Sequence, residues 1–247
     1  MIRRAIVTGA GSGIGAGIAT ALAQKGIRPV LVGRREDALL RTLETIRGQG
    51  FDADPLTWDI GNGDDAEALV DRVETQFGAA DTLVHAAGNQ FRCPAVEFPV
   101  EQWDQILGLH LRAAFLLTQA AGKRMIASGR GGSLLFIGSL TSERLGLPNV
   151  VAYAAAKSGL LGLMRTLAVE WAPHSIRSNA ILVGFVGTEM TRDVDEQPAR
   201  KALMARAPIG RLGTPNEIGE AAAYLTSDGA SFVTGTCLTI DGGWSIA

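Results

Sequence analysis

Short apolar runs alternate with longer amphipathic stretches along the chain. The apolar runs predict strands at Ile2–Thr8, Pro29–Val32, Asp54–Trp58, Thr82–Ala86, Ser133–Ile137, Ser178–Val183 and Thr236–Ile240. The amphipathic stretches predict helices at 14–26, Glu36–Gly48, Asp64–Phe77, Glu101–Ala127 and Asn216–Thr226, and one that holds Tyr153. This alternation is typical of βαβ units. We therefore predict an α/β fold with one domain over residues 1–247: a Rossmann-type, doubly wound parallel sheet of about seven strands with helices on both faces.

Charge and composition exclude several classes of partner. The net charge is −2 and no basic run exceeds the pairs Arg3-Arg4 and Arg34-Arg35, so a nucleic-acid surface is not expected. No apolar run reaches the roughly 18 residues of a membrane span, and the first residues do not resemble a signal peptide. We therefore expect a cytoplasmic protein without a membrane partner. The two cysteines and three histidines show no metal-ligand spacing, so no metal site is expected.

A glycine-rich turn follows the first predicted strand and leads into the first helix. The turn reads Gly9-Ala-Gly-Ser-Gly-Ile-Gly15. Such a turn lets the backbone approach a phosphate, and the helix N-terminus offers it free amide groups. Many glycine turns only reverse the chain, but this one stands where a dinucleotide fold has its first βα turn. Asp59, Gly88, Ser139 and Gly184 also follow predicted strands, so we expect all of them to line one crevice.

Tyr153 and Lys157 are candidates for acid/base chemistry. Their spacing of four places both on one face of a helix, where an ammonium lowers the pKa of a neighbouring phenol. Ser139, at the end of an apolar run, offers a hydroxyl to the same substrate oxygen. The alternative is that the Tyr/Lys spacing is an accident of an amphipathic helix. The expected convergence of strand ends favours the catalytic interpretation.

In these residues the chain resembles the short-chain dehydrogenase/reductase family, and it does so over its full length. The matching features are the glycine turn with Thr8, Asp59, Ala87-Gly88, Ser139, Tyr153 with Lys157, Asn179-Ala180-Ile181, Thr188 and Asp241-Gly242-Gly243-Trp244. Any one of these features is weak alone. Their order and spacing together are highly specific.

The resemblance implies hydride transfer between a nicotinamide cofactor and an alcohol/ketone pair. Tyr153 is then the general acid/base, Ser139 polarises the carbonyl, and Lys157 lowers the pKa of Tyr153 and binds the nicotinamide ribose. The implied cofactor contacts also include Gly9, Ser12, Gly13, Ile14, Gly15, Asp59, Ile60, Ala87, Gly88, Gly184, Val186 and Thr188. The cofactor supplies the hydride, and the protein supplies orientation and proton transfer.

Three positions depart from the common family pattern. His110 stands where many members have an asparagine that helps a proton relay, and we expect it to have a supporting catalytic role. His85-Ala86 replaces two asparagines, which should alter local hydrogen bonding more than chemistry. Val183 replaces a proline beside the nicotinamide.

The second predicted strand ends in basic residues. Arg34 and Arg35 follow Gly33, and the acids Glu36 and Asp37 are expected to begin the next helix. An arginine at this place can hold a 2′-phosphate with bidentate hydrogen bonds, whereas an acid would bind free ribose hydroxyls. We therefore favour NADP(H) as cofactor, with NAD(H) as the alternative.

The segment between Ser139 and Tyr153 is similar to that of family members that act on sugar acids, such as the gluconate 5-dehydrogenases. Arg92 and Arg144 are candidates to face a substrate carboxylate, and Ser139 is a further candidate substrate contact. Met190 lies in the segment Phe185–Gly213, which is expected to cover the substrate. Two alternatives stay open: a 3-oxoacyl thioester reductase, and a non-catalytic dinucleotide-binding sensor. The resemblance also implies a homo-oligomer, a tetramer or dimer, formed through the long helices and the C-terminal strand. The small residues Ala154, Ala155, Ser158, Gly159 and Gly162 would allow close helix approach.

Overall fold

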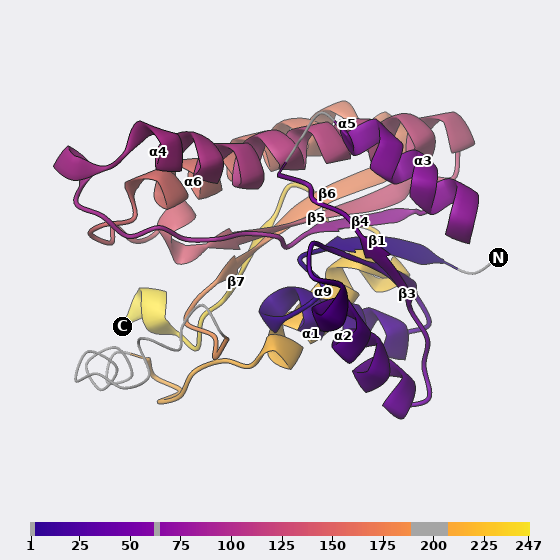
Figure 1. Ribbon diagram of the computed structural model, residues 1–247, viewed down its shortest axis with the longest axis horizontal. Helices are drawn as coiled ribbons and strands as arrows, with labels where there is room; N and C mark the ends of the chain where they lie inside the picture. Colours follow the sequence, from indigo (N-terminus) through magenta and orange to yellow (C-terminus); the bar gives the residue numbers. More distant parts are fainter. Residues whose placement is uncertain (1–2, 62–64, 189–206) are drawn as a thin grey trace.

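A sheet of parallel strands forms the centre of the molecule, with helices above and below it (Figure 1). The computed structural model describes residues 3–61, 65–188 and 207–247. The strands are β1 (Arg4–Thr8), β2 (Arg28–Gly33), β3 (Asp54–Thr57), β4 (Thr82–His85), β5 (Gly132–Ser139), β6 (Ile176–Val183) and β7 (Cys237–Ile240). They form one seven-stranded sheet in the order β3-β2-β1-β4-β5-β6-β7, and each neighbouring pair is parallel. The predicted doubly wound fold is confirmed.

The helices cover both faces of this sheet. They are α1 (Gly13–Gln24), α2 (Glu36–Gly48), α3 (Ala66–Phe77), α4 (Val100–Leu107), α5 (Ala113–Ser128), α6 (Val151–Glu170) and α9 (Pro215–Thr226). In Figure 1, α1, α2 and α9 lie below the sheet, and α3, α4, α5 and α6 lie above it. The helix predicted over Glu101–Ala127 differs from the prediction, because a π-helical turn at Gly108–Arg112 separates α4 from α5.

Each strand sends alternate side chains into two separate cores. In β1, Ile6 packs with the α3, α5 and α6 side, while Val7 packs with α1, α2 and α9. Phe136 and Leu135 of β5 divide in the same way. This is the period of two expected of a strand, and burial on both faces explains why these strands read as continuous apolar runs. The sheet is therefore held rigidly between two apolar layers.

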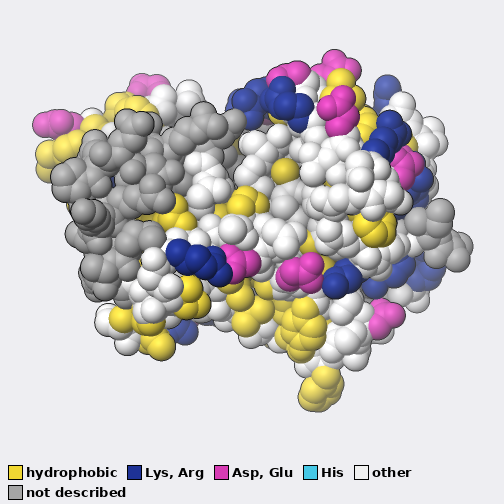
Figure 2. Space-filling model, turned by 90° about the horizontal axis from the view of Figure 1, so that it is seen from below, with side chains coloured by type: hydrophobic (Ala, Val, Ile, Leu, Met, Phe, Trp, Pro, Cys, Tyr) yellow, Lys and Arg dark blue, Asp and Glu magenta, His cyan; other side chains and the backbone are white. Residues whose placement is uncertain are grey.

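Ion pairs and a helix cap join elements on the lower face. The side chain of Lys25, the residue that directly follows α1, lies 3.3 Å from that of Glu220 on α9. Thr214 and Glu217 form a capping box at the start of α9, and Arg211 donates two hydrogen bonds to the Glu217 carboxylate. Figure 2 shows this face, on which basic and acidic side chains lie among one another.

In residues 3–61, 65–188 and 207–247, no helix is both long and apolar enough to cross a membrane. The same residues contain no group of three or more His, Cys, Asp or Glu side chains placed to hold a metal ion.

The sheet order reverses at β1, which has β2 on one side and β4 on the other. In a parallel sheet of this type, such a reversal opens a crevice beyond the carboxyl ends of the strands. The glycine turn follows β1, the loop with Gly88 follows β4, and Ser139 is the last residue of β5. Residues far apart in sequence therefore meet at this edge.

Candidate active site

Two adjoining cavities lie at the carboxyl edge of the sheet. The larger encloses about 280 Å³, and among its lining residues are Ser139, Tyr153, Lys157, His110 and most of the glycine turn. The smaller encloses about 130 Å³ and lies beyond the end of β2. Both are lined by Gly9, Ser12 and Gly88, so they meet at the turn that was predicted to hold phosphates.

The glycine turn is shaped for a bound anion. Gly9 and Gly13 have φ values of +69° and +53°, in the left-handed region that favours glycine. A Cβ atom on Gly15 would lie 2.2 Å from the Gly9 carbonyl oxygen. Helix α1 begins at Gly13 with Ser12 as N-cap, without a side-chain cap and without an acid in its first turn. Its N-terminal amides and positive dipole end are therefore open to a pyrophosphate.

The smaller cavity suits the adenosine half of a dinucleotide. Arg34, Arg35, Asp59, Ile60 and Ala87 all line it, as expected from the sequence. The acids that follow the arginines do not line it. Glu36 and Asp37 occupy the first turn of α2, and Asp37 pairs with Arg41 at 2.7 Å. Arg34 and Arg35 therefore line this cavity, whereas Glu36 and Asp37 do not.

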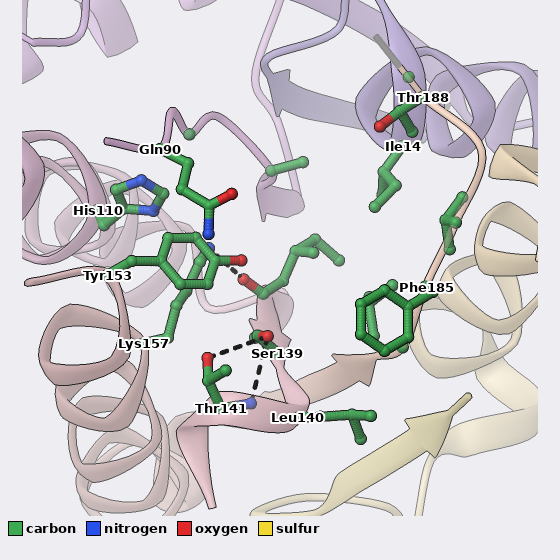
Figure 3. A pocket seen from close by; sticks show the side chains of 18 of the residues that line it. Ile14, Gln90, His110, Ser139, Leu140, Thr141, Tyr153, Lys157, Phe185 and Thr188 are labelled. Carbon is green, nitrogen blue, oxygen red and sulfur yellow. Dashed lines mark hydrogen bonds between the residues drawn. The ribbon is translucent and has the colours of Figure 1, made fainter. Parts of the chain in front are cut away.

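Ser139, Tyr153 and Lys157 converge in the larger cavity (Figure 3). Tyr153 and Lys157 lie on the first turns of α6, and the Lys157 Nζ atom is 5.7 Å from the centre of the Tyr153 ring. Lys157 is 4% exposed and its Nζ donates to the Ile137 carbonyl at 2.6 Å. This bond ties α6 to the end of β5 and fixes the ammonium behind the phenol.

The Ser139 hydroxyl oxygen is held by Thr141, two residues further along the chain. It accepts hydrogen bonds from the Thr141 amide at 3.3 Å and from the Thr141 hydroxyl at 3.1 Å. A hydroxyl oxygen has two lone pairs, so its own hydrogen remains available for donation. The 3₁₀ turn Leu140–Ser142 creates these contacts at the end of β5. Ser139 is therefore oriented as a hydrogen-bond donor toward the cavity.

Burial is the largest cause of the pKa shifts of Tyr153 and Lys157. It raises the pKa of Tyr153, and a hydrogen bond with Ser139 offsets part of that rise. It also lowers the pKa of Lys157 to about 7. The sequence predicted a lowered Tyr153 pKa, and in this chain the direction is the opposite. The physical reason is that desolvation disfavours the phenolate, while Lys157 itself carries only part of its charge near neutral pH.

His110 lies beside the pair on the π-helical turn. It is buried, and its ring meets the Tyr153 ring edge-on with centroids 5.3 Å apart. Its Nε2 atom is 3.1 Å from the Asn89 amide nitrogen and 2.8 Å from the Asn89 carbonyl oxygen. The tautomer decides which of the two bonds forms. A Cβ atom on Gly88 would lie 2.5 Å from His110 Cε1, so the imidazole occupies space that only a glycine leaves open.

His85, the second departure from the family pattern, is fully buried behind the site. Its Nδ1 atom is 3.5 Å from the Thr8 hydroxyl, which also accepts hydrogen bonds from the Ala86 and Ala87 amides. Burial first, and then the charge of Lys157, lower its pKa to about 3. His85 is therefore a neutral side chain that joins the ends of β1 and β4.

The remaining predicted cofactor residues also line the larger cavity. They are Ile14, Gly184, Val186 and Thr188. Gly184 is needed for close packing, because a Cβ there would lie 2.7 Å from the Asp241 Cα atom. These residues come from the turn after β1 and from the segment after β6, which therefore face each other across the cavity.

The predicted substrate residues divide into three groups. Arg92 lines the larger cavity, as expected. Arg144 does not line it: the turn at Leu140 directs this residue outward, where its side chain is exposed. Met190 lies outside the described residues. The substrate role of Arg144 stays a prediction, and Arg92 is the one of the two arginines that lines the cavity.

Several lining residues were missed by the sequence reasoning. Gln90, Leu145, Leu147 and Phe185 also line the larger cavity. Gln90 could have been found, because it lies two residues from Arg92 on the same loop. Phe185 could have been found as the residue after Gly184. The two leucines carry no sequence signal that separates them from core residues.

Comparison with known proteins identifies the family. A family model described as enoyl-(acyl carrier protein) reductase matches residues 9–245. The chain belongs to the short-chain dehydrogenase/reductase family. It is therefore an NAD(P)-dependent oxidoreductase of an alcohol/carbonyl pair, and the non-catalytic sensor is disfavoured.

Relatives of this dehydrogenase/reductase cover almost all of its length. It is 37% identical to a 2-dehydro-3-deoxy-D-gluconate 5-dehydrogenase of Escherichia coli, over 97% of this chain and 94% of the relative. It is 34% identical to a 3-oxoacyl-[acyl-carrier-protein] reductase of Thermotoga maritima, over 96% of each chain. A crystal structure of a gluconate 5-dehydrogenase from Burkholderia cenocepacia, in complex with NADP and tartrate, has a TM-score of 0.93 at 34% identity. It covers 99% of this chain and 96% of that one.

Proposed function

We propose that this protein interconverts a secondary alcohol and a ketone on a small hydroxy acid or polyol, with NADP(H) as cofactor. The observation that carries the proposal is the convergence of Ser139, Tyr153 and Lys157 on one cavity that Arg92 also lines. A guanidinium at the wall suits a carboxylate, and sugar acids carry one. The similarity to enzymes named for sugar acids supports the same class of substrate.

Each residue of the central group has a distinct task. Ser139 donates a hydrogen bond to the substrate oxygen, and Tyr153 donates a proton to that oxygen or removes one from it. Lys157 Nζ, with a pKa near 7, takes up and releases a proton close to working pH. Tyr153 and Lys157 would also contact the cofactor ribose, and the glycine turn would hold the pyrophosphate. When bound, the cofactor supplies or accepts the hydride.

The preference for NADP(H) rests on Arg34 and Arg35, which line the adenosine cavity while the acids of α2 do not. A 2′-phosphate would receive bidentate hydrogen bonds there. The test compares kcat/KM with NADP and NAD for the wild type and for the Arg34→Ala/Arg35→Ala double variant. We expect the preference for NADP to fall at least about 10-fold in the variant. A wild-type preference for NAD that survives both substitutions contradicts the proposal, and NAD(H) is then the cofactor.

The reaction itself is tested with purified protein and NADP(H) against sugar acids, polyols, simple ketones and 3-oxoacyl thioesters. We expect turnover with hydroxylated substrates, and Tyr153→Phe should abolish it while the affinity for NADPH stays nearly unchanged. Turnover confined to thioesters would favour the 3-oxoacyl reductase. Cofactor binding without turnover of any of these substrates would favour the alternative of a non-catalytic dinucleotide-binding sensor.

We also infer that the chain, one domain over residues 1–247, forms a homo-oligomer. Exposed apolar side chains support this: Phe115 on α5, Val169 on α6, and Phe232 and Ile246 near the C-terminus. Part of the small-residue stripe on α6 has another use, since a Cβ on Gly159 would lie 2.8 Å from the Leu111 side chain of the same chain. Light scattering coupled to gel filtration tests the assembly, and a monomer at micromolar concentration would contradict it. The cytoplasmic location stays a prediction for cell fractionation.

A further inference from the structure

The loop after β4 carries alternate side chains to opposite sides. Within Asn89–Cys93, Gln90 and Arg92 line the larger cavity. Phe91, between them, packs edge-on against Phe98 with ring centroids 5.5 Å apart and joins a small apolar cluster beneath α4 and α6. An extended segment alternates in this way. We call residues Asn89–Cys93 the substrate strap.

The substrate strap is fixed at both ends. At its start, the Asn89 backbone hydrogen-bonds to Nε2 of the buried His110. At its end, the Cys93 amide donates to the Asn149 carbonyl at 3.0 Å. Asn149 has a φ of +65°, an uncommon value outside glycine, and it lies just before α6. The strap is therefore held between the π-helical turn and the loop that follows Ser139.

The side-chain amide of Gln90 has no hydrogen-bond partner among the described residues. Its side chain is half-buried. Figure 3 shows its amide directed into the cavity, between His110 and Tyr153. A carboxamide both donates and accepts hydrogen bonds, whereas a guanidinium only donates. Gln90 therefore matches a hydroxyl group, while Arg92 matches an anion.

We propose that Gln90 is a specificity-determining residue that binds a substrate hydroxyl next to the reacting carbon, and that His110 is the positioning residue that holds Gln90 there through the substrate strap. The proposal rests on the proposed function and deepens it. A hydroxylated substrate pairs with the carboxamide, while an alkyl chain leaves the same carboxamide desolvated and unpaired. The site therefore discriminates between polyol chains and hydrocarbon chains.

The test uses two ketones that differ by one hydroxyl group, acetoin and 2-butanone, with NADPH. The measured quantity is the ratio of the two kcat/KM values. We expect the wild type to favour acetoin at least about 10-fold, and Gln90→Leu to reduce the ratio to near one. Gln105→Leu, at an exposed position on α4, is the matched control and should keep the wild-type ratio.

A second pair of variants tests the role of His110. His110→Ala should raise KM for acetoin and lower the ratio, and the Gln90→Leu/His110→Ala double variant should show no further loss of discrimination. A merely structural effect would lower both kcat/KM values and leave their ratio unchanged. NADPH affinity, measured by fluorescence titration, separates substrate effects from cofactor effects.

The outcomes distinguish this proposal from the proposed function. Turnover of both ketones with a ratio that Gln90→Leu does not change would overturn the role of Gln90. Additive losses in the double variant would overturn the positioning role of His110. A wild type that binds NADPH but turns over neither ketone nor any other carbonyl contradicts the proposed function, and the Gln90 proposal fails with it.

Discussion

Lys157 is proposed to be needed for catalysis, but the burial of its ammonium should lower the free energy of unfolding. Replacing Lys157 with methionine tests this expectation. Methionine keeps a long unbranched side chain but removes the charge. The pKa of Lys157 falls from 10.5 to about 7 because burial disfavours the ammonium. At about 1.36 kcal/mol per unit of pKa shift, this difference corresponds to roughly 5 kcal/mol of unfavourable free energy for the charged form in the folded protein. Lys157→Met removes that cost, but it also leaves the buried Ile137 carbonyl without its donor.

The net effect depends on pH in a defined direction. Below pH 7 the lysine is protonated in both the folded and unfolded states, and the burial cost is complete. Between pH 7 and 10.5 only the unfolded chain holds the proton, so the cost declines as pH rises. An unpaired carbonyl costs about 1–3 kcal/mol at every pH. We expect Lys157→Met to unfold with about 2–4 kcal/mol more free energy at pH 7, and with no advantage at pH 10.

Urea denaturation at pH 7 and pH 10, at equal protein concentration, measures this difference. Lys123→Met is the control, because Lys123 is exposed on α5 and pairs with Glu67. The control should change the free energy of unfolding by less than about 1 kcal/mol at both pH values. If Lys157→Met is no more stable than the wild type at pH 7, or if the difference is the same at both pH values, the argument from burial fails.

Three further predictions follow from contacts described above. Gly15→Ala places a Cβ 2.2 Å from the Gly9 carbonyl, so NADPH affinity measured by fluorescence should fall at least about 10-fold. Gly88→Ala conflicts with His110 Cε1 at 2.5 Å, so thermal unfolding should show a smaller loss of Tm in a His110→Asn background than in the wild type. Glu217 has a pKa of about 2, so its ionised form contributes stability that is complete above pH 4.5 and is lost as pH falls through 2. Glu217→Gln should therefore lower Tm at pH 7, and circular dichroism melts at pH 3 should show a smaller difference.

The sequence predicted the frame of the site well, because local pattern and position carry that information. Apolar runs located all seven strands, and in a parallel sheet their ends share one edge. The glycine turn, Ser139, Tyr153 and Lys157 consequently meet in one cavity, as expected from their place after strands or on one helix face. Position along the chain was enough for these residues.

Features that depend on three-dimensional packing were not predictable. The π-helical turn at Gly108–Arg112 reads as ordinary helix, because the apolar pattern continues through it. Arg144 and Arg92 both lie near site residues in sequence, and only the turn after Ser139 separates them in space. The Tyr153 pKa depends on burial, which raises it and which the hydrogen bond with Ser139 offsets only in part. The spacing of two residues along a helix predicts only the direction in which one side chain shifts the pKa of the other. The burial of the group, which the sequence does not show, decides the direction of the total shift.

The anchor between Cys93 and Asn149 has a consequence for changing what this enzyme accepts. It joins the loops after β4 and β5 through main-chain atoms alone, a Cys93 amide and an Asn149 carbonyl. A main-chain hydrogen bond does not depend on the identity of most side chains around it. Libraries that vary residues 90, 92, 145 and 147 together can therefore alter the walls of the cavity while the two loops keep their spacing, which makes this pair of loops a natural unit for redesign.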